Sequence, residues 1–411
     1  MQTELAGFIR DTPEGLEAEA ILRKCVHCGF CTATCPTYQL LGDELDSPRG
    51  RIYLIKQALE GAPVTERTRL HLDRCLTCRA CETTCPSGVQ YGRLADIGRS
   101  VVESRTTRGR WDRCKRTALG FVLPRTALFG ALLRLGQLFR PVLPHPLRAK
   151  VPVRPEPAGA WPAPRHGRTM LVLAGCVQPA LAPAINAAAA RVLDRLGISL
   201  VAAPNAGCCG ALRFHLNDQK AGMDDMRALI GAWWPWTERA DLEAIVMTAS
   251  GCGVMVEEYG QLFANDPDDR HRAARISLLT KDIAEVIAAE AKALEKLLAP
   301  RARRGRIAFH SPCTLQHGQQ IRGVVENLLE RAGYELTPLE DAHLCCGSAG
   351  TYSILQPDLS AQLRARKLAA IAAGDPRMIA TANIGCLVHL QAGTATPVRH
   401  WIELLDDALQ E

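Results

Sequence analysis

Two runs of four cysteines lie within the first hundred residues. The spacing Cys-x2-Cys-x2-Cys-x3-Cys-Pro begins at Cys25 and again at Cys75, and the runs end at Pro36 and Pro86. Three thiolates two residues apart surround one [4Fe-4S] cube and reach three of its irons, while the fourth iron needs a ligand from outside the loop. The doubled spacing predicts two [4Fe-4S] clusters.

In two-cluster ferredoxins the last cysteine of each run binds the cluster of the other run. This pattern predicts Cys25, Cys28, Cys31 and Cys85 for one cluster, and Cys75, Cys78, Cys81 and Cys35 for the other. A pair of zinc sites is the alternative, but zinc usually takes two Cys-x2-Cys pairs, which fits these runs poorly. His27 and His71 lie near the runs and are not predicted to be ligands.

A second set of cysteines is duplicated at long period. Three cysteines recur later in the chain at one constant displacement, and a fourth recurs at a slightly shorter one, which indicates an internal duplication. The two candidate sets for a further cluster or redox site are Cys176, Cys208, Cys209, Cys252 and Cys313, Cys345, Cys346, Cys386. Gly207, Gly210 and Gly347 flank the paired cysteines, where they are expected to let the backbone turn tightly.

The elements that must position these cysteines alternate between strands and helices. Each repeat has three short apolar runs that precede its cysteines and are separated by helical stretches. The predicted strands are 170–174, 198–203 and 244–248, then 306–310, 334–339 and 378–381. This order predicts α/β repeats with parallel sheets, whose strand ends would bring the cysteines together.

Length and composition predict several domains in a reducing compartment. The chain has 411 residues, 47% of them apolar and 22% charged, with 17 cysteines that are not spaced like a small disulfide framework. The N-terminus lacks the features of a signal peptide, which indicates a cytoplasmic protein. We expect a mixed α+β chain with a helical two-cluster ferredoxin-like domain at 1–110, a basic helical segment and proline-rich linker at 111–168, and cysteine-rich repeats at 169–304 and 305–411.

Positive charge is concentrated in one stretch of the chain. The formal net charge is +6, whereas residues 99–168 hold 15 Lys and Arg against three Asp and Glu. Within this stretch, residues 117–144 are largely apolar, with Arg125, Arg134 and Arg140 spaced so that one helix would keep an apolar face. Such a helix either packs on this protein or a partner subunit, or it lies on a membrane surface.

With these motifs in view, the chain resembles the family of iron–sulfur subunits of bacterial glycolate oxidase over nearly its whole length. The resemblance is carried by the ferredoxin runs, by LLGDELDSPRGRIYLIK at 40–56, and by GCCG at 207–210 and CCGSAGTY at 345–352. It implies an electron-transfer subunit that receives electrons from FAD-containing flavoprotein subunits and passes them towards a membrane quinone. The basic apolar segment at 117–144 could place the electron exit near anionic lipid, so we expect a peripheral position on the inner face of the cell membrane. No nucleic-acid partner is expected.

The missing motifs place the substrate chemistry on another chain. We find no dinucleotide-binding glycine pattern, P-loop or flavin fingerprint. The same architecture occurs in lactate-utilisation proteins and in the small subunit of anaerobic glycerol-3-phosphate dehydrogenase, so L-lactate and glycerol 3-phosphate are the alternative substrates of the complex.

A further alternative is a heterodisulfide-reductase-like enzyme that uses the cysteine-rich domain itself. In that family the matching domain ends in Cys-x2-Cys, but Ala249 and Asn383 replace the first cysteine of that pair here. Each repeat therefore keeps four cysteines. These are interpreted as metal or redox sites, or as a docking scaffold that binds zinc or nothing. Cys114 lies outside every set and is predicted to be a free thiol.

Overall fold

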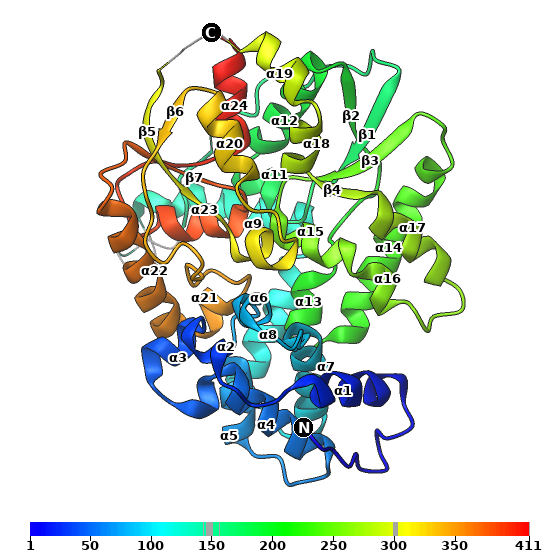
Figure 1. Ribbon diagram of the computed structural model, residues 1–411. Helices are drawn as coiled ribbons and strands as arrows, with labels where there is room; N and C mark the ends of the chain where they lie inside the picture. The colour runs from blue at the N-terminus through cyan, green and yellow to red at the C-terminus, as the bar shows by residue number, and fades with distance from the viewer. Residues whose placement is uncertain (143, 145–150, 156, 299–302, 411) are drawn as a thin grey trace.

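A computed structural model describes residues 1–142, 144, 151–155, 157–298 and 303–410. Helices of the first hundred residues form one end of the molecule, where the N-terminus lies, and two parallel sheets lie side by side towards the opposite end (Figure 1). The predicted mixed fold, with a helical N-terminal region and duplicated α/β repeats, is confirmed.

The N-terminal region consists of helices whose starts are set by caps and prolines. Thr12 caps α1 and Ser47 caps α4, and a proline occupies the first turn of both helices. Their apolar faces meet α7 in a common core that includes Ile21, Ile55 and Leu94. The elements are α1 (Pro13–Lys24), α2 (Phe30–Ala33), α3 (Pro36–Leu41), η1 (Glu44–Asp46), α4 (Pro48–Leu59), α5 (Glu66–Asp73), α6 (Ala80–Thr84) and α7 (Tyr91–Arg105).

The basic apolar segment forms two helices, so the expectation of one helix over 117–144 is wrong. α8 (Arg110–Val122) ends just before Pro124, and α9 (Thr126–Phe139) continues into a 3-10 turn, η2 (Arg140–Val142). Pro124 breaks the helix because it lacks an amide hydrogen and clashes with the preceding turn. The two parts meet at 108°, and no single helix in the described residues is long and apolar enough to cross a membrane.

The first repeat is a four-stranded parallel sheet in the order β2-β1-β3-β4. β1 pairs with β2 from Arg168↔Ile198 to Val172↔Ala202 and with β3 on its other side. The strands are β1 (Arg168–Val172), β2 (Ile198–Ala202), β3 (Leu242–Met247) and β4 (Thr280–Asp282). The helices are α11 (Gln178–Leu181), α12 (Ala184–Arg195), α13 (Ala211–His215), α14 (Gln219–Thr237), α15 (Ser250–Glu257), α16 (Tyr259–Leu262), α17 (Arg270–Leu279), α18 (Ile283–Ala289) and α19 (Ala291–Leu297).

The second repeat has the same topology, with the order β6-β5-β7-β8 and all neighbours parallel. Its strands are β5 (Gly305–His310), β6 (Tyr334–Leu336), β7 (Met378–Thr381) and β8 (Val398–His400). A π-helical turn, η3 (Thr314–Gly318), follows β5, and the helices are α20 (Val324–Arg331), α21 (Tyr352–Leu355), α22 (Pro357–Ala372), α23 (Ile384–Gln391) and α24 (Trp401–Gln410). The duplicated order confirms the internal repeat.

The two repeats share one apolar core. Side chains of α12 and α18 in the first repeat pack with those of α20 and α24 in the second, with the fully buried Trp401 among them. At the strand ends, Ser250 donates its backbone amide to the Ala382 carbonyl at 3.3 Å, and His400 Nε2 lies 2.9 Å from the Thr248 carbonyl. The carboxyl ends of both sheets are thereby held against each other.

The segment between α9 and β1 contains the predicted linker. Its described residues from 151 to 167 form no helix or strand, and the remainder of the predicted linker lies outside the described residues. Trp161 donates its indole N–H to the Leu200 carbonyl at 3.1 Å, which holds this extended stretch against the edge strand β2.

Candidate functional site

The two cysteine runs fold into the same loop twice. His27 and Gly29 in the first loop, and Thr77 and Arg79 at the equivalent positions of the second, have left-handed backbone conformations. A short helix, α2 or α6, follows each loop. A non-glycine residue in this conformation costs about 1–2 kcal/mol, so three of them in two matching loops indicate that the loop shape itself is required.

Each loop encloses a cavity together with the last cysteine of the other run. The first cavity is lined by Cys25, Cys28, Cys31 and Cys85, and the second by Cys75, Cys78, Cys81 and Cys35. Cys81 borders both cavities, so the two sites are adjacent. All eight thiols are free of disulfides. Four sulfur donors around each cavity are the donor set that a [4Fe-4S] cluster requires.

Burial makes Cys78 and Cys81 poor acids without a metal. Desolvation raises the pKa of Cys78 and of Cys81 well above the ordinary thiol value. Burial also opposes ionisation of Cys75, but the positive charges of Arg51 and Arg99 outweigh it and lower the pKa of that thiol. Cys78 and Cys81 therefore need the charge of bound iron to remain thiolates.

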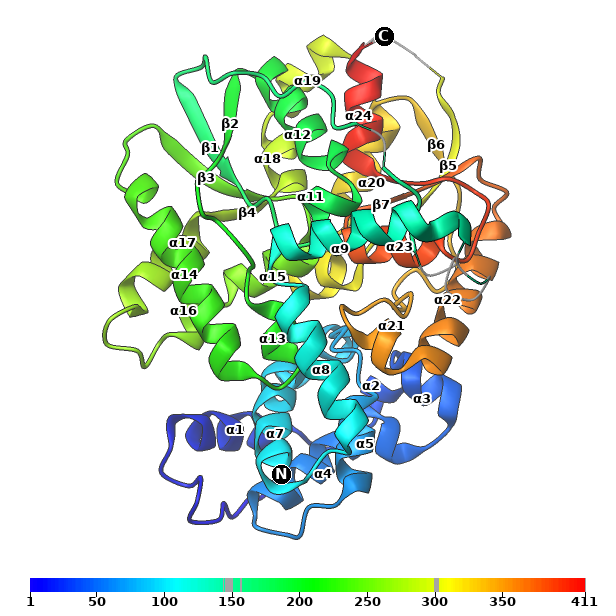
Figure 2. The same cartoon turned by 180° about the vertical axis from the view of Figure 1, so that it is seen from behind.

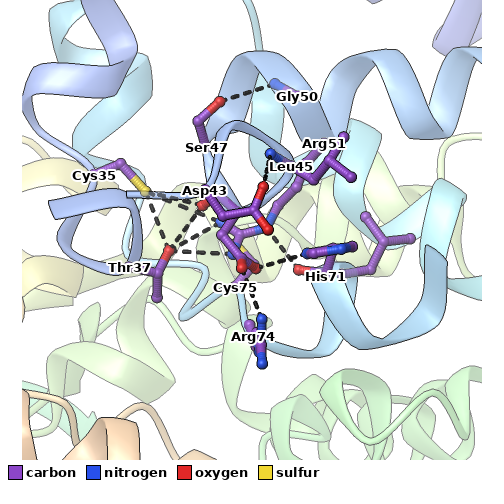
Figure 3. Close-up of polar contacts among 12 residues, drawn as sticks. Cys35, Thr37, Asp43, Leu45, Ser47, Gly50, Arg51, His71, Arg74 and Cys75 are labelled. Carbon is purple, nitrogen blue, oxygen red and sulfur yellow. Dashed lines mark hydrogen bonds and ion pairs between the residues drawn. The ribbon is translucent and has the colours of Figure 1, made fainter. Parts of the chain in front are cut away.

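A buried charge network supports the second loop (Figure 3). Asp46 is fully buried and accepts hydrogen bonds from Arg51 at 3.3 Å and Arg74 at 2.8 Å, and His71 Nδ1 lies 3.1 Å from it. Arg51 also donates to Thr37 Oγ1 and to the His71 carbonyl, and its Nη1 lies 4.0 Å from Cys35 Sγ. The His71 side chain thus contacts the Asp46 carboxylate.

The first repeat gathers its four cysteines at the carboxyl ends of its strands. Cys176 follows β1, Cys208 and Cys209 follow β2, and Cys252 lies in the first turn of α15 after β3. Hydrogen bonds from Cys176 and Cys209 lower the pKa of Cys208, whereas the pKa of each of these two neighbours is raised. The four side chains border one cavity at the switch point between β1 and β3.

The second repeat gathers its cysteines in the same way. Cys313 Sγ lies 3.8 Å from Cys345 Sγ, and the sulfurs of Cys346 and Cys386 lie within 4.8 Å of each other. Asn383, at the position of the absent fifth cysteine, points its amide nitrogen at Cys386 Sγ, 3.6 Å away. The predicted sets of four therefore come together in both repeats.

Paired glycines shape both Cys-Cys loops. Gly210 and Gly347 have φ of +78° and +90°, and a Cβ atom would lie 2.5 Å from the Gly222 carbonyl oxygen at the first and 2.7 Å from that of Ser360 at the second. Both positions therefore require glycine. Gly207 does not, because its Cβ would point into open space and its φ is ordinary, so the expectation of a tight turn there is wrong.

A cavity of about 490 Å³ joins the ferredoxin region to both repeats. Its walls include thiols from the second ferredoxin loop and from each repeat, together with charged side chains. The cysteines that line it are Cys75, Cys78, Cys176, Cys208, Cys209, Cys252, Cys313, Cys345 and Cys386. The cavity thus brings sulfur ligands from three parts of the chain to one place.

Polar contacts fix the ferredoxin region on the repeats. Arg79 forms an ion pair with Glu258, Thr83 Oγ1 lies 3.0 Å from His317 Nδ1, and Tyr352 donates to the Arg74 carbonyl at 3.2 Å. Cys78 and Cys313 pack against one apolar cluster that contains Cys345. The second ferredoxin loop therefore lies directly beside the cysteines of the second repeat.

Several of these residues were not found by sequence reasoning. Arg51 and Arg99 support the second cluster loop, and His310 approaches the cysteines of the second repeat. When the two repeats are aligned on their shared cysteines, His310 of the second repeat falls opposite Leu173 of the first. That change from an apolar to a metal-binding residue type would have identified His310. Cys114 is exposed on α8 and lies outside both cavities and both cysteine-rich sites.

A pair of cluster-binding loops joined to two thiol-lined α/β repeats defines an iron–sulfur electron-transfer protein. Residues 21–89 match the 4Fe-4S dicluster domain, and residues 170–257 and 307–391 match the cysteine-rich domain. The chain belongs to the family of glycolate oxidase iron–sulfur subunits.

Two members of this family span most or all of the chain. The glycolate oxidase iron-sulfur subunit of Escherichia coli is 55% identical over the whole of both chains. The probable glycolate oxidase iron-sulfur subunit of Bacillus subtilis is 31% identical over 91% of this chain and 89% of its own. Lactate utilization protein A of Geobacillus kaustophilus is 26% identical but matches only 54% of this chain and 92% of its own.

Proposed function

We propose that this chain is the electron-transfer subunit of a complex that oxidises glycolate to glyoxylate. A flavoprotein subunit carrying FAD would oxidise the substrate, and this chain would carry the electrons one at a time through its two clusters towards a membrane quinone. The support for glycolate over L-lactate is that similarity to the glycolate oxidase subunits spans the chain, whereas similarity to the lactate protein spans about half of it.

The observation that carries the relay is the unequal position of the two cluster loops. The first loop is at the surface, where Val26 is 69% and Phe30 61% exposed beside the exposed Cys28. The second loop faces the central cavity and the cysteines of the second repeat. We infer that electrons enter at the first cluster, pass to the second and continue to centres in the cysteine-rich repeats.

The substrate assignment is tested by combining this chain with its flavoprotein partners under anaerobic conditions. Glycolate is expected to bleach the iron–sulfur absorption of the complex within the time of a catalytic turnover. The chain alone is expected to remain oxidised in the presence of glycolate because it has no flavin. Reduction by L-lactate or glycerol 3-phosphate, without reduction by glycolate, would assign the complex to a different substrate.

The α8–α9 segment supports a position at the cytoplasmic face of the cell membrane. Leu132, Leu135, Leu138 and Phe139 are exposed on α9 at helical spacing, and Figure 2 shows this helix running across one side of the molecule. The surrounding stretch is strongly basic. An apolar stripe with basic neighbours suits a surface of anionic lipid.

Substitution of this stripe is expected to weaken membrane binding. Leu138 is 72% exposed, so Leu138→Glu removes apolar area without disturbing the core. Loss of one leucine from the lipid is expected to weaken binding to anionic vesicles by roughly tenfold or more. Leu278→Glu, at an equally exposed leucine on α17, is the matched control. Equal vesicle binding by both variants would refute the membrane assignment, and disruption of subunit assembly by Leu138→Glu would assign the stripe to a partner protein.

A further inference from the structure

His310 is a buried imidazole without a polar partner. It ends strand β5, is 1% exposed, and neither of its ring nitrogens has a hydrogen-bond partner among the described residues. An unpaired buried polar group costs a few kcal/mol, and native proteins leave few of them. Two unpaired nitrogens on one buried ring indicate that something absent from the polypeptide completes the site.

The ring faces two thiols of the second repeat. A ring nitrogen of His310 and the sulfurs of Cys346 and Cys386 all lie within 4.8 Å of one another, and all three residues are buried. Cys345, adjacent in sequence to Cys346, connects this group to Cys313 through the 3.8 Å sulfur contact. The imidazole thus lies beside two of the four sulfurs, and the other two follow through Cys345.

The first repeat lacks every polar feature of this site. When the repeats are aligned on their first three cysteines, Leu173 and Ile230 of the first repeat occupy the positions of His310 and Lys367 in the second. At the slightly shorter displacement of the fourth cysteine, Ala249 replaces Asn383. Leu173 and Ile230 are buried parts of the apolar core. The two repeats share a fold and four cysteines, but only the second surrounds its cysteines with a histidine, a lysine and an amide.

Lys367 gives the second site a positive charge where thiolates would gather. Its side chain is 3% exposed, and its Nζ donates to the Asp341 carbonyl at 2.7 Å. No carboxylate within salt-bridge distance balances this charge among the described residues. A buried cation without a carboxylate partner favours a negatively charged centre nearby, as an iron–sulfur cluster with several thiolate ligands would be.

We propose that His310 is a ligand, together with the cysteines of the second repeat, of an iron–sulfur centre that the first repeat cannot form. The four cysteines and His310 offer five donors, whereas a single zinc ion takes four. An iron–sulfur centre therefore fits this set better than zinc. The centre would accept one electron from the reduced cluster of the second ferredoxin loop beside it. This choice of metal rests on the proposed relay, whereas the ligand role of His310 rests on its geometry.

The mixed ligand set has a functional consequence. A neutral imidazole in place of a thiolate leaves the centre with less negative charge, and histidine ligation raises the potential of an iron–sulfur centre. The second repeat would therefore attract electrons more strongly than an all-cysteine centre in the first repeat. This assigns the second repeat, and not the first, as the next step beyond the ferredoxin clusters.

The proposal is tested by pulsed EPR on the full chain, purified and reduced without oxygen. The ferredoxin clusters have only sulfur ligands, so a strong 14N coupling from a directly bound nitrogen is expected from the second-repeat centre alone. His310→Leu, which installs the residue of the first repeat, is expected to abolish that coupling. His310→Cys is expected to retain the iron, lose the coupling and shift the centre to a lower potential.

His389→Gln is the matched control, since His389 also lies in the second repeat but already has a partner, with Nε2 3.3 Å from Ser360 Oγ. The coupling is expected to persist in this variant. The proposal would be overturned if the wild-type chain lacked the coupling or if His310→Leu kept it. It would also be overturned if His310→Cys lost the iron of this centre, or if the metal beyond the ferredoxin clusters were zinc. A failure of glycolate turnover alone would affect only the proposed substrate, because this spectrum requires no partner subunit.

Discussion

Cys85→Ala is expected to eliminate the cluster of the first cysteine run, and Cys35→Ala that of the second. Each of these cysteines lies in the other run's cavity, so its loss leaves the opposite cluster with three thiolate ligands. Each variant should lose about four iron atoms per chain and the EPR signature of two interacting clusters. Electron transfer from the flavin through this chain should fall to background.

Two further variants show which cluster has been lost. Cys28 and Cys78 each occur in only one cavity of the pair, so their alanine variants provide reference spectra for loss of the first or the second cluster. Cys85→Ala should reproduce the spectrum and potential of Cys28→Ala, and Cys35→Ala those of Cys78→Ala. The reverse pairing would show that each run supplies all four ligands of its own cluster. Cys114→Ala, at an exposed thiol, should retain both clusters.

Asp46→Asn is expected to be the most destabilising conservative substitution in the ferredoxin region. The amide keeps the shape of the carboxylate but leaves Arg51, 1% exposed, without its counter-charge. Breaking a buried ion pair in this way typically costs about 3–5 kcal/mol. Anaerobic thermal unfolding should show a large decrease in the midpoint, accompanied by faster bleaching of the clusters.

An exposed ion pair provides the control for this effect. Glu19 contacts Arg23 at 2.6 Å on the surface of α1, so Glu19→Gln should change the unfolding free energy by less than about 1 kcal/mol. Adding Arg51→Met to Asp46→Asn removes the stranded charge and should restore part of the lost stability. Unfolding of Asp46→Asn at the wild-type midpoint would show that the network contributes nothing to stability.

The candidate cluster ligands could be identified from sequence because their spacing is local. Within each run, three of the four cysteines lie within seven consecutive residues. A single loop therefore sets their relative positions, independently of the rest of the fold. The parallel strands of the repeats were also predictable, since short apolar runs between helices favour parallel pairing. Predicted and observed strand ends differ by at most a few residues, the largest difference being β6, which stops at Leu336.

Other elements depend on contacts that local patterns do not record. The fourth strands, Thr280–Asp282 and Val398–His400, are three residues long and exist because β3 and β7 offer them an edge for pairing. The sequence contains Pro124 at the bend between α8 and α9, but the apolar spacing of 117–144 suggested a continuous helix. Here the backbone requirement of proline outweighed the side-chain pattern.

By itself, the sequence determined which cysteines are candidate ligands, that the repeats are duplicated and to which family the chain belongs. The tertiary structure alone decided what those cysteines face. The sheet order brings His310 to Cys346 and Cys386, and the docking of the ferredoxin region places Cys78 beside Cys313. Because these partners are separated by tens to hundreds of residues, only packing of the sheets and domains specifies the contact. Local spacing sets which atoms can bind a metal, whereas the fold sets which centres can exchange electrons.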